Sequence, residues 1–322
     1  SSSPCFAASD ITELSLEALM DIEVTSVSKR PEKRSQAAAA IYVITPERIR
    51  RWGVTNVPDA LRMVPGLQVA RIDANKWAIS SRGFNSRFAN KLLVLIDGRS
   101  VYTPLFAGVY WEMQDLPLED IERIEVIRGP GGTLWGANAV NGVVNIITRS
   151  ARDSQGSLVS LTAGTEETIA TVRHGGTLAP QTWYRAYARY RDEDQGYARQ
   201  GAHDDWSLGQ AGFRVDREGA TDRLTVQGDY YQGRAGQQLT IPVDPPPARR
   251  TLTDTTHLSG ANLLARWQRQ LADGSTVMLQ GYLDHVERNG RVLYENRDTV
   301  DVELQHDVFL QDHHRLVWGL GY

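Results

Sequence analysis

The feature that most constrains the fold of this chain is the segment at residues 121–149, IERIEVIRGPGGTLWGANAVNGVVNIITR. Two runs rich in β-branched residues, IEVI and VVNII, flank a stretch of glycines and small polar residues, and such runs are typical of strands. The Gly-Pro-Gly-Gly sequence at 129–132 predicts a turn, because glycine allows positive φ and proline fixes its own φ. The small residues between Gly136 and Gly142 are expected to permit a close backbone approach.

A glycine-rich turn of this kind can also bind phosphate. A Walker loop would need Gly-Lys-Ser/Thr after the turn, and a dinucleotide fingerprint would need the start of an amphipathic helix. Neither follows residues 129–132, so the sequence argues against phosphate binding. A purely structural turn in a soluble β-protein stays open for the segment alone, and the rest of the chain argues against it.

Composition sets the broad class. The chain has 322 residues, enough for two domains, and its net charge of -4 gives no basic surface for nucleic acid. Its mean hydropathy is -0.38, and it lacks any apolar run of about eighteen residues, which excludes helical membrane spans. A transmembrane β-barrel is not excluded, because its alternating strands carry a weak hydropathy pattern.

Residues 1–20 are interpreted as a signal-peptide remnant and N-terminal extension. Phe-Ala-Ala-Ser at 6–9 resembles the small-residue end of a secretory signal. Cys5 is the only cysteine, so no intrachain disulfide forms, and the preceding Ser3-Pro4 disfavours a lipidated cysteine. The alternative for this stretch is a disordered tail.

Residues 21–150 mix short helices and short strands. Thr-Pro-Glu at 45–47 predicts a helix start, and Gly53 predicts its end. A second short helix is expected over 58–64. The apolar run at 92–96 predicts a buried strand that ends in an Asp-Gly turn. These elements predict a small α+β domain.

After Ser150 the pattern becomes one of long alternating segments. Within 182–191, aromatic and small residues share one face and three arginines share the other. The arginines are Arg185, Arg189 and Arg191. About nine such segments follow one another, each roughly nine to eleven residues long, which is the length of a tilted transmembrane strand. Strands of soluble sandwiches are shorter, at about five or six residues. Residues 233–256, which contain three consecutive prolines, are expected to form a long extracellular loop.

The motifs together resemble the TonB-dependent outer-membrane receptors. A basic residue, Gly-Pro, a small-residue turn, an aromatic before glycine and then Gly-Val-Val-Asn-Ile-Ile-Thr resemble the end of the family's plug domain. Arg-Gly-Phe at 82–84 is similar to a strand end of the plug, and LLVLIDGR at 92–99 with Tyr102 is similar to its central hairpin. The dense part of the resemblance runs from about Asp21 to Arg149.

This resemblance implies an α+β plug domain followed by antiparallel transmembrane β-barrel strands. The barrel part is all-β and incomplete. Residues 21–150 would be the plug and residues 151–322 a fragment of a 22-stranded barrel. About nine strands cannot close around a plug of this size, since barrel diameter grows with strand number. An open sheet with two unpaired edges is therefore expected.

The resemblance also implies a function. It implies a receptor of the bacterial cell outer membrane that is not an enzyme and that takes up a scarce nutrient, most simply a ferric siderophore, by active transport. Energy would come from the inner-membrane proton gradient through TonB, which captures an exposed segment by strand addition. The segment that resembles this TonB box consists of Ile22, Glu23, Val24, Thr25, Ser26, Val27 and Ser28. An ordinary first strand of the plug is the alternative.

The partners implied are TonB with its inner-membrane energising complex, outer-membrane lipid and a metal chelate or similar small molecule. No nucleic acid, cofactor or bound metal is expected, and the receptor is expected to be a monomer. The residues expected to contact ligand at the plug apices are Arg87, Phe88, Phe106 and Tyr110. The alternative for Phe106 and Tyr110 is packing against the barrel wall. Plug–barrel salt bridges are assigned to Arg82, Glu125 and Arg128, because charges in a wet lumen need partners.

Other functions stay open at this point. Cobalamin, haem or another large substrate would use the same plug, and a non-transporting β-barrel adhesin or structural protein would need no TonB box. A signalling receptor would need a further domain before residue 21. Catalysis finds no support: the chain has no Gly-x-Ser-x-Gly or His-Glu-x-x-His motif. The adjacent His313 and His314 would point to opposite faces of a strand.

Overall fold

The computed structural model describes residues 23–24, 32–33, 40–131, 135–136, 138–197, 201–245, 248–310 and 314–322. Their contacts divide them into two compact units that interleave along the sequence. The mixed unit comprises the described residues of Ser1–Ala70, Ala78–Tyr110 and Ile121–Thr148; the sheet unit comprises those of Arg71–Trp77, Trp111–Asp120 and Arg149–Tyr322. Within the described ranges, no helix has the length and apolar character needed to cross a membrane.

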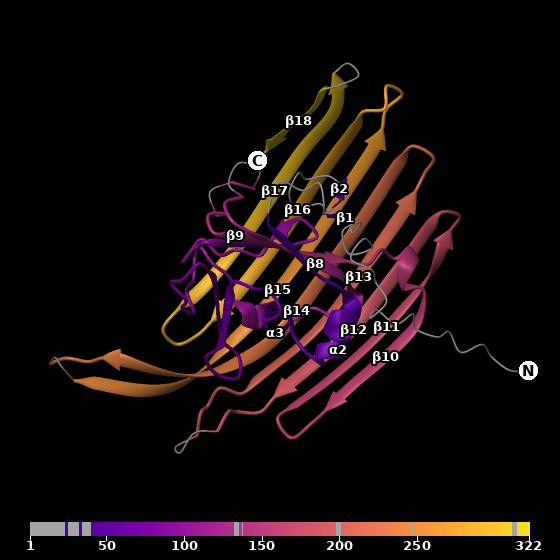
Figure 1. Ribbon diagram of the computed structural model, residues 1–322. Helices are drawn as coiled ribbons and strands as arrows, with labels where there is room; N and C mark the ends of the chain where they lie inside the picture. Colours follow the sequence, from indigo (N-terminus) through magenta and orange to yellow (C-terminus); the bar gives the residue numbers. More distant parts are fainter. Residues whose placement is uncertain are drawn as a thin grey trace, which may run out of the picture. The chain divides into compact units, whose positions relative to one another are not determined.

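The mixed unit is built on a five-stranded sheet with the order β3-β8-β9-β6-β7 (Figure 1). Strands β6 and β9 run parallel, and the other neighbouring pairs are antiparallel. The strands are β3 (Ile41–Ile44), β6 (Leu92–Ile96), β7 (Arg99–Ser100), β8 (Ile121–Arg128) and β9 (Gly142–Thr148). Two further short pairs are β1 (Glu23–Val24) with β2 (Glu32–Lys33), and β4 (Leu67–Arg71) with β5 (Trp77–Ser81).

Two short helices precede this sheet's central strands, and their caps explain their bounds. Helix α2 (Pro46–Trp52) begins after Thr45, whose hydroxyl accepts a hydrogen bond from Arg48 N, and ends at Gly53 with φ 62°. The predicted start and end of this helix are confirmed. Helix α3 (Val57–Leu61) starts after Asn56 and is shorter than the predicted span of 58–64.

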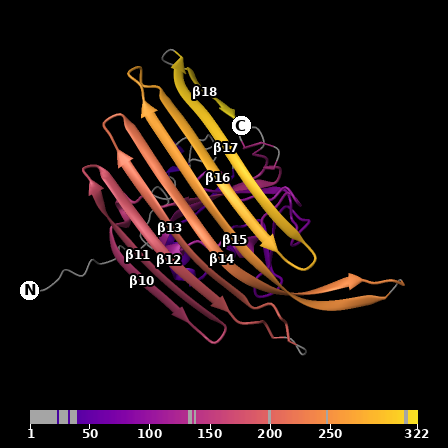
Figure 2. The same cartoon turned by 180° about the vertical axis from the view of Figure 1, so that it is seen from behind.

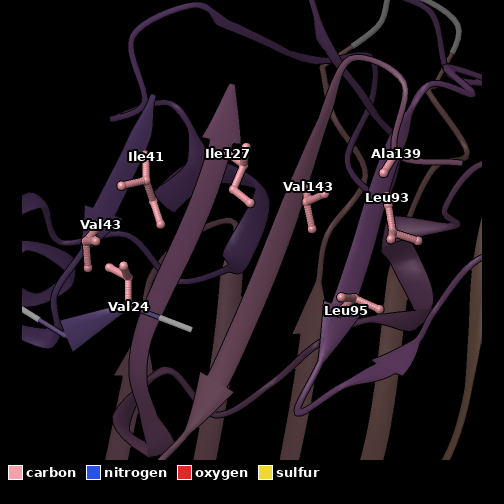
Figure 3. Close-up of a cluster of buried hydrophobic side chains, with 8 residues drawn as sticks. All are labelled: Val24, Ile41, Val43, Leu93, Leu95, Ile127, Ala139 and Val143. Atoms are coloured by element: carbon pink, nitrogen blue, oxygen red, sulfur yellow. The ribbon is translucent and has the colours of Figure 1, made fainter. Parts of the chain in front are cut away.

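The core of the mixed unit includes β6, a strand that is apolar along its whole length. Every residue of β6 is buried, as its continuous apolar run predicted. Figure 3 shows eight of the core side chains, which come from five segments of the chain. They are Val24, Ile41, Val43, Leu93, Leu95, Ile127, Ala139 and Val143. Distant segments therefore depend on one another through a single core.

Two glycines of the segment 121–149, Gly136 and Gly142, are required for different reasons. A Cβ at Gly142 would lie 2.5 Å from the carbonyl oxygen of Ile127, so the close backbone approach expected there is confirmed. At Gly136 the space is open, and the residue is required instead by its φ of +82°. The predicted turn after Asp97 is also present, with positive φ at Asp97 and Gly98.

The sheet unit contains nine antiparallel strands in sequence order, which confirms the predicted number and orientation (Figures 1 and 2). Among the described residues, the first and last strands each pair on one side only. The strands are β10 (Gly156–Ala163), β11 (Glu167–Ala179), β12 (Thr182–Glu193), β13 (Trp206–Glu218), β14 (Asp222–Pro242), β15 (Arg249–Gln270), β16 (Thr276–Asn289), β17 (Tyr294–Leu310) and β18 (His314–Gly321). The described residues also form three short 3-10 turns: η3 (Trp111–Met113), η4 (Leu118–Asp120) and η5 (Arg152–Ser154).

The two faces of this sheet differ in chemistry. One face is apolar and exposed: large side chains occupy matching positions on neighbouring strands, including Phe213, Leu263, Leu283 and Val300. The opposite face carries buried polar groups, among them the three arginines of β12, which are at most 5% exposed. The alternation predicted for this strand is therefore confirmed.

The prediction of a long loop over 233–256 is wrong for most of that span, which forms two paired strands. Strand β14 continues to Pro242 and β15 begins at Arg249, so the two form one long hairpin (Figure 2). Leu239 pairs with Leu252 across it, and the hydroxyls of Thr240 and Thr251 lie 3.2 Å apart. The physical reason is that the β-branched and apolar residues at 239–241 pair with residues 250–252, which continues the ladder as far as Pro242 and Arg249.

Candidate functional site

The candidate ligand site lies in the mixed unit, on two loops that follow β5 and β7. Residues 103–108 form a tight turn: Thr103 N donates to the Gly108 carbonyl at 2.8 Å, and Ala107 has φ 59°. A Cβ at Gly108 would lie 2.4 Å from the carbonyl oxygen of Ala89, which belongs to the other loop. The missing side chain of Gly108 therefore lets the two loops touch.

The four predicted ligand residues come together as one cluster on these loops. The rings of Phe88 and Phe106 meet edge to face with centroids 5.0 Å apart, and those of Phe106 and Tyr110 do so at 4.9 Å. The Arg87 guanidinium lies 5.4 Å from the Phe88 ring centroid. Tyr110 is buried at the base, whereas 51% of Phe88 is exposed. The cluster offers apolar ring surface beside a cation, and its contact with ligand stays a prediction.

The same loop carries a second aromatic–cation pair, which was not predicted. Phe84 is 85% exposed, and the Lys91 ammonium lies 4.9 Å from its ring centroid. The charge pattern of the sequence could have indicated this pair, because the stretch at 78–96 holds three basic residues and no acidic one.

The segment predicted as a TonB box lies mostly outside the described residues. Of its seven members, Ile22, Thr25, Ser26, Val27 and Ser28 are not described. Glu23 and Val24 form the short strand β1, in which they pair with Lys33 and Glu32. Val24 is fully buried in the core of the mixed unit. Its role in capture by TonB stays a prediction.

The three residues assigned to plug–barrel salt bridges all belong to the mixed unit. Glu125 is fully buried, and one of its carboxylate oxygens accepts a hydrogen bond from Arg123 at 2.7 Å. Arg128 donates to the carbonyl of Pro65 at 3.0 Å. Arg82 has a φ of 64°. These contacts lie inside one unit, and the assignment to salt bridges with the barrel stays a prediction.

A buried ion network dominates the sheet unit. Asp115 accepts two hydrogen bonds from Arg189, at 2.8 and 3.1 Å, and lies 3.3 Å from the Arg191 guanidinium. Arg191 also reaches Glu167 at 3.1 Å and Glu193 at 3.6 Å. Burial alone would raise the pKa of Asp115, but the attraction of Arg191 and Arg189 and their hydrogen bonds outweigh it, so its pKa is lowered.

Two further acids of the segment Trp111–Asp120 also form buried ion pairs with arginines of the sheet unit. Asp120 pairs with Arg173 at 2.5 Å and lies 3.7 Å from Arg185. Glu112 lies 3.7 Å from Arg288. Segment Trp111–Asp120 is thus tied by its acids to strands β11, β12 and β16 of the sheet unit.

A second segment, Arg71–Trp77, is held by backbone-directed hydrogen bonds. The Asn75 amide donates to the carbonyls of Asp204 and Gly236 at 2.8 and 2.9 Å, and Ala74 N donates to the Asp204 carboxylate at 2.7 Å. Trp77 meets Trp206 edge to face, with ring centroids 5.9 Å apart. The shared face of the β12 arginines was predicted, but neither of the two segments that contact the sheet was.

Cation binding finds no support in the described ranges, which hold no group of three His, Cys, Asp or Glu side chains placed to ligate a metal ion.

Residues 33–143 match the family model for the TonB-dependent Receptor Plug Domain. The chain is 35% identical over 167 residues to the Vitamin B12 transporter BtuB of Vibrio vulnificus (strain CMCP6). That alignment covers 49% of this chain and 27% of the relative, so the chain spans little more than a quarter of its length.

The fold is similar to solved outer-membrane receptors. The ferripyoverdine receptor of Pseudomonas aeruginosa superposes with a TM-score of 0.71 at 16% identity, covering 93% of this chain and 44% of that one. The alcaligin outer-membrane receptor FauA of Bordetella pertussis superposes with a TM-score of 0.69 at 15% identity, covering 93% and 49%. At these identities the likeness concerns the fold alone.

Proposed function

We propose that this chain, which belongs to the TonB-dependent receptors by its plug domain and the strands that follow it, forms part of a transporter for a scarce nutrient. Its fold is that of bacterial outer-membrane receptors, and that membrane is the proposed location. The ligand that we favour is a ferric siderophore, and the energy source is TonB driven by the inner-membrane proton gradient. Residues 21–150 act as the plug, and residues 151–322 supply part of the barrel.

The observation that carries this proposal is the cluster of Arg87, Phe88, Phe106 and Tyr110. These residues come from two loops, yet their rings and guanidinium form one contiguous surface on the plug. Aromatic rings beside a cation suit a bulky chelate that has apolar and anionic parts. The buried Tyr110 fixes the base of the cluster, and the half-exposed Phe88 meets the ligand.

The coupling step is release of residues 22–28 to TonB. Support comes from the packing of Val24, whose burial in the core holds β1 in place before release. Ligand binding shifts the population towards the released segment only if the ligand binds that state more tightly. TonB then pairs with the free segment by adding a strand, for which backbone N–H and C=O groups are sufficient.

The coupling step is tested with Val27→Pro and its matched control Val27→Ala, in the receptor expressed from its complete gene. Proline removes one backbone donor and fixes φ, whereas alanine keeps the donor. We expect Val27→Pro to abolish energised uptake and TonB cross-linking but to leave ligand binding intact, as deletion of residues 22–28 should. Wild-type uptake by Val27→Pro and by the deletion would overturn the transport proposal and favour a non-transporting adhesin or structural protein.

A second candidate ligand is cobalamin, because the relative that is 35% identical over 167 residues is a vitamin B12 transporter. Growth on a panel of ferric chelates, haem and cobalamin separates the candidates. Rescue of an iron-starved strain by a ferric chelate supports the siderophore proposal. Rescue of a cobalamin-requiring strain alone would replace it.

A further inference from the structure

The paired strands β14 and β15 extend beyond their neighbours in the sheet unit. Strand β13 begins opposite Ala235, and β16 ends opposite His257. Among the described residues, 236–242 and 249–255 therefore pair only with each other (Figure 2). We call this projecting two-stranded part the ribbon. Two strands alone are marginally stable, so the contacts at the root of the ribbon decide how freely it moves.

The turn between β4 and β5, residues 72–76, holds the root of the ribbon. The Gly236 carbonyl accepts hydrogen bonds from Asn75 Nδ2 at 2.9 Å and from Lys76 Nζ at 3.2 Å. The same Asn75 amide donates to the Asp204 carbonyl at 2.8 Å, in the loop that precedes β13. Asn75 is fully buried and Lys76 is 5% exposed, and all of these residues belong to the sheet unit. We call the two donors to Gly236 the clasp.

The turn that carries the clasp is itself held rigid. Ile72 N donates to the Lys76 carbonyl at 2.8 Å and closes the turn. The Asp73 carboxylate accepts hydrogen bonds from Asn75 N at 3.1 Å and from the Lys76 ammonium at 2.9 Å, which gives the buried cation its counter-charge. Lys76 also donates to Asn75 Oδ1 at 2.7 Å and so orients the amide. Both donors of the clasp are therefore preorganised.

The base of the turn is fixed to the strands beside the ribbon. Arg71 forms an ion pair with Glu193, the last residue of β12. Trp77 packs edge to face on Trp206, the first residue of β13, with ring centroids 5.9 Å apart. Both of these rings are 2% exposed. The base therefore holds the turn to the sheet, while its tip holds the ribbon.

The root of the ribbon is packed too closely to shift without moving its contacts. A Cβ at Gly236 would lie 2.5 Å from the carbonyl oxygen of His203. The Gly236 N–H also donates to the Asp205 carbonyl at 2.8 Å. Close-packed contacts transmit strain because they are hardly compressible. A displacement of the root is therefore passed to the clasp.

We propose that Asn75 and Lys76 couple the ribbon to the β4–β5 strand pair, so that whatever displaces the ribbon shifts this pair. Because residues 72–76 join β4 directly to β5, movement of the turn is carried on through the chain itself. Such coupling is reciprocal, so a change in the strand pair alters the freedom of the ribbon by the same factor. Asn75 and Lys76 are positioning residues that act through the Gly236 carbonyl. The coupling does not depend on which ligand the receptor binds.

The first test is amide hydrogen exchange in the receptor expressed from its complete gene. Asn75→Ala combined with Lys76→Met, the clasp-free variant, removes both donors to Gly236. Exchange in the ribbon should accelerate about tenfold, since two buried hydrogen bonds at its root are lost. The matched control is Asn296→Ala, which removes an exposed amide that donates to Tyr294 Oη at 3.2 Å. It should leave exchange in the ribbon at the wild-type rate.

The second test displaces the ribbon and measures the strand pair. Gly236→Ala pushes the root away from its contacts, and exchange of residues 67–71 and 77–81 should change by at least about threefold. In the clasp-free variant the same substitution should change that exchange by less than about twofold, because the connection is gone. Gly209→Ala is the control, since the nearest atom to its Cβ is 3.8 Å away, and it should match the wild type.

Wild-type exchange of the ribbon in the clasp-free variant would overturn the proposal. So would wild-type exchange of β4 and β5 in Gly236→Ala, or an equal effect of that substitution with and without the clasp. Strand β17 reports on the stability of the whole sheet. Acceleration there in the clasp-free variant would mean that Asn75 and Lys76 hold the entire sheet, and this result would also overturn the coupling.

Discussion

Asp115 is the acid whose loss should most loosen the segment Trp111–Asp120. Its carboxylate binds Arg189 through two hydrogen bonds and lies 3.3 Å from Arg191, and all three side chains are at most 3% exposed. Asp115→Asn would leave two buried guanidinium groups short of one counter-charge. Removal of one partner of a buried ion pair typically costs 3 to 5 kcal/mol.

The lower end of that range applies here. Arg189 keeps its hydrogen bond to Thr171 at 2.9 Å, and Arg191 keeps Glu167 and Glu193. We therefore expect a loss of about 3 kcal/mol in the free energy that opens this segment. Amide hydrogen exchange in the segment should accelerate by about a hundredfold, since each 1.4 kcal/mol is a factor of ten.

The matched control is Arg152→Gln, which breaks an exposed ion pair with Glu218. It should change the free energy of opening, as measured by exchange, by less than about 1 kcal/mol.

The folded-state pKa of Asp115 is lowered. The stabilisation by its carboxylate is therefore present above the usual aspartate pKa and is lost as pH falls through the folded-state pKa. Protection of the segment should therefore decrease below about pH 4. Equal exchange in Asp115→Asn and the wild type would show that Asp115 does not hold this segment, as would an equal effect of the control.

Three further outcomes are expected. Gly142→Ala should lower the midpoint of thermal unfolding of the mixed unit by several degrees, because its Cβ would meet a carbonyl at 2.5 Å; Gly164→Ala, where the nearest atom is 3.7 Å away, should not. Asn56→Ala should reduce the unfolding free energy in denaturant titration by about 1 kcal/mol, since the cap to Asp59 N is lost. If the exposed apolar face contacts lipid as the proposed location implies, Leu283→Arg should destabilise the refolded receptor in lipid vesicles by about 2 to 4 kcal/mol; no penalty there would contradict that contact.

Local chemistry explains why most of the elements could be predicted. Thr45, Pro46 and Gly53 define α2 through groups within a few residues of one another. The apolar run of β6 needs burial on both faces wherever it lies. The alternation in β12 similarly places Arg185, Arg189 and Arg191 on one face, since successive side chains of a strand point to opposite sides. The hairpin β14–β15 was mispredicted because a run of three prolines in the sequence is typical of a loop, although β14 continues to Pro242 and β15 starts at Arg249.

The sequence by itself therefore determined the element types, the number of long strands and the family resemblance, because each depends on periodicity, caps or motifs within short windows. Tertiary structure alone decided which residues meet. Asp115 and Arg189 are 74 positions apart, and Asn75 and Gly236 are 161 apart. The interleaving of the two units and the ring cluster around Phe106 arise from such contacts, and no local pattern encodes the partner of a buried charge or an exposed ring.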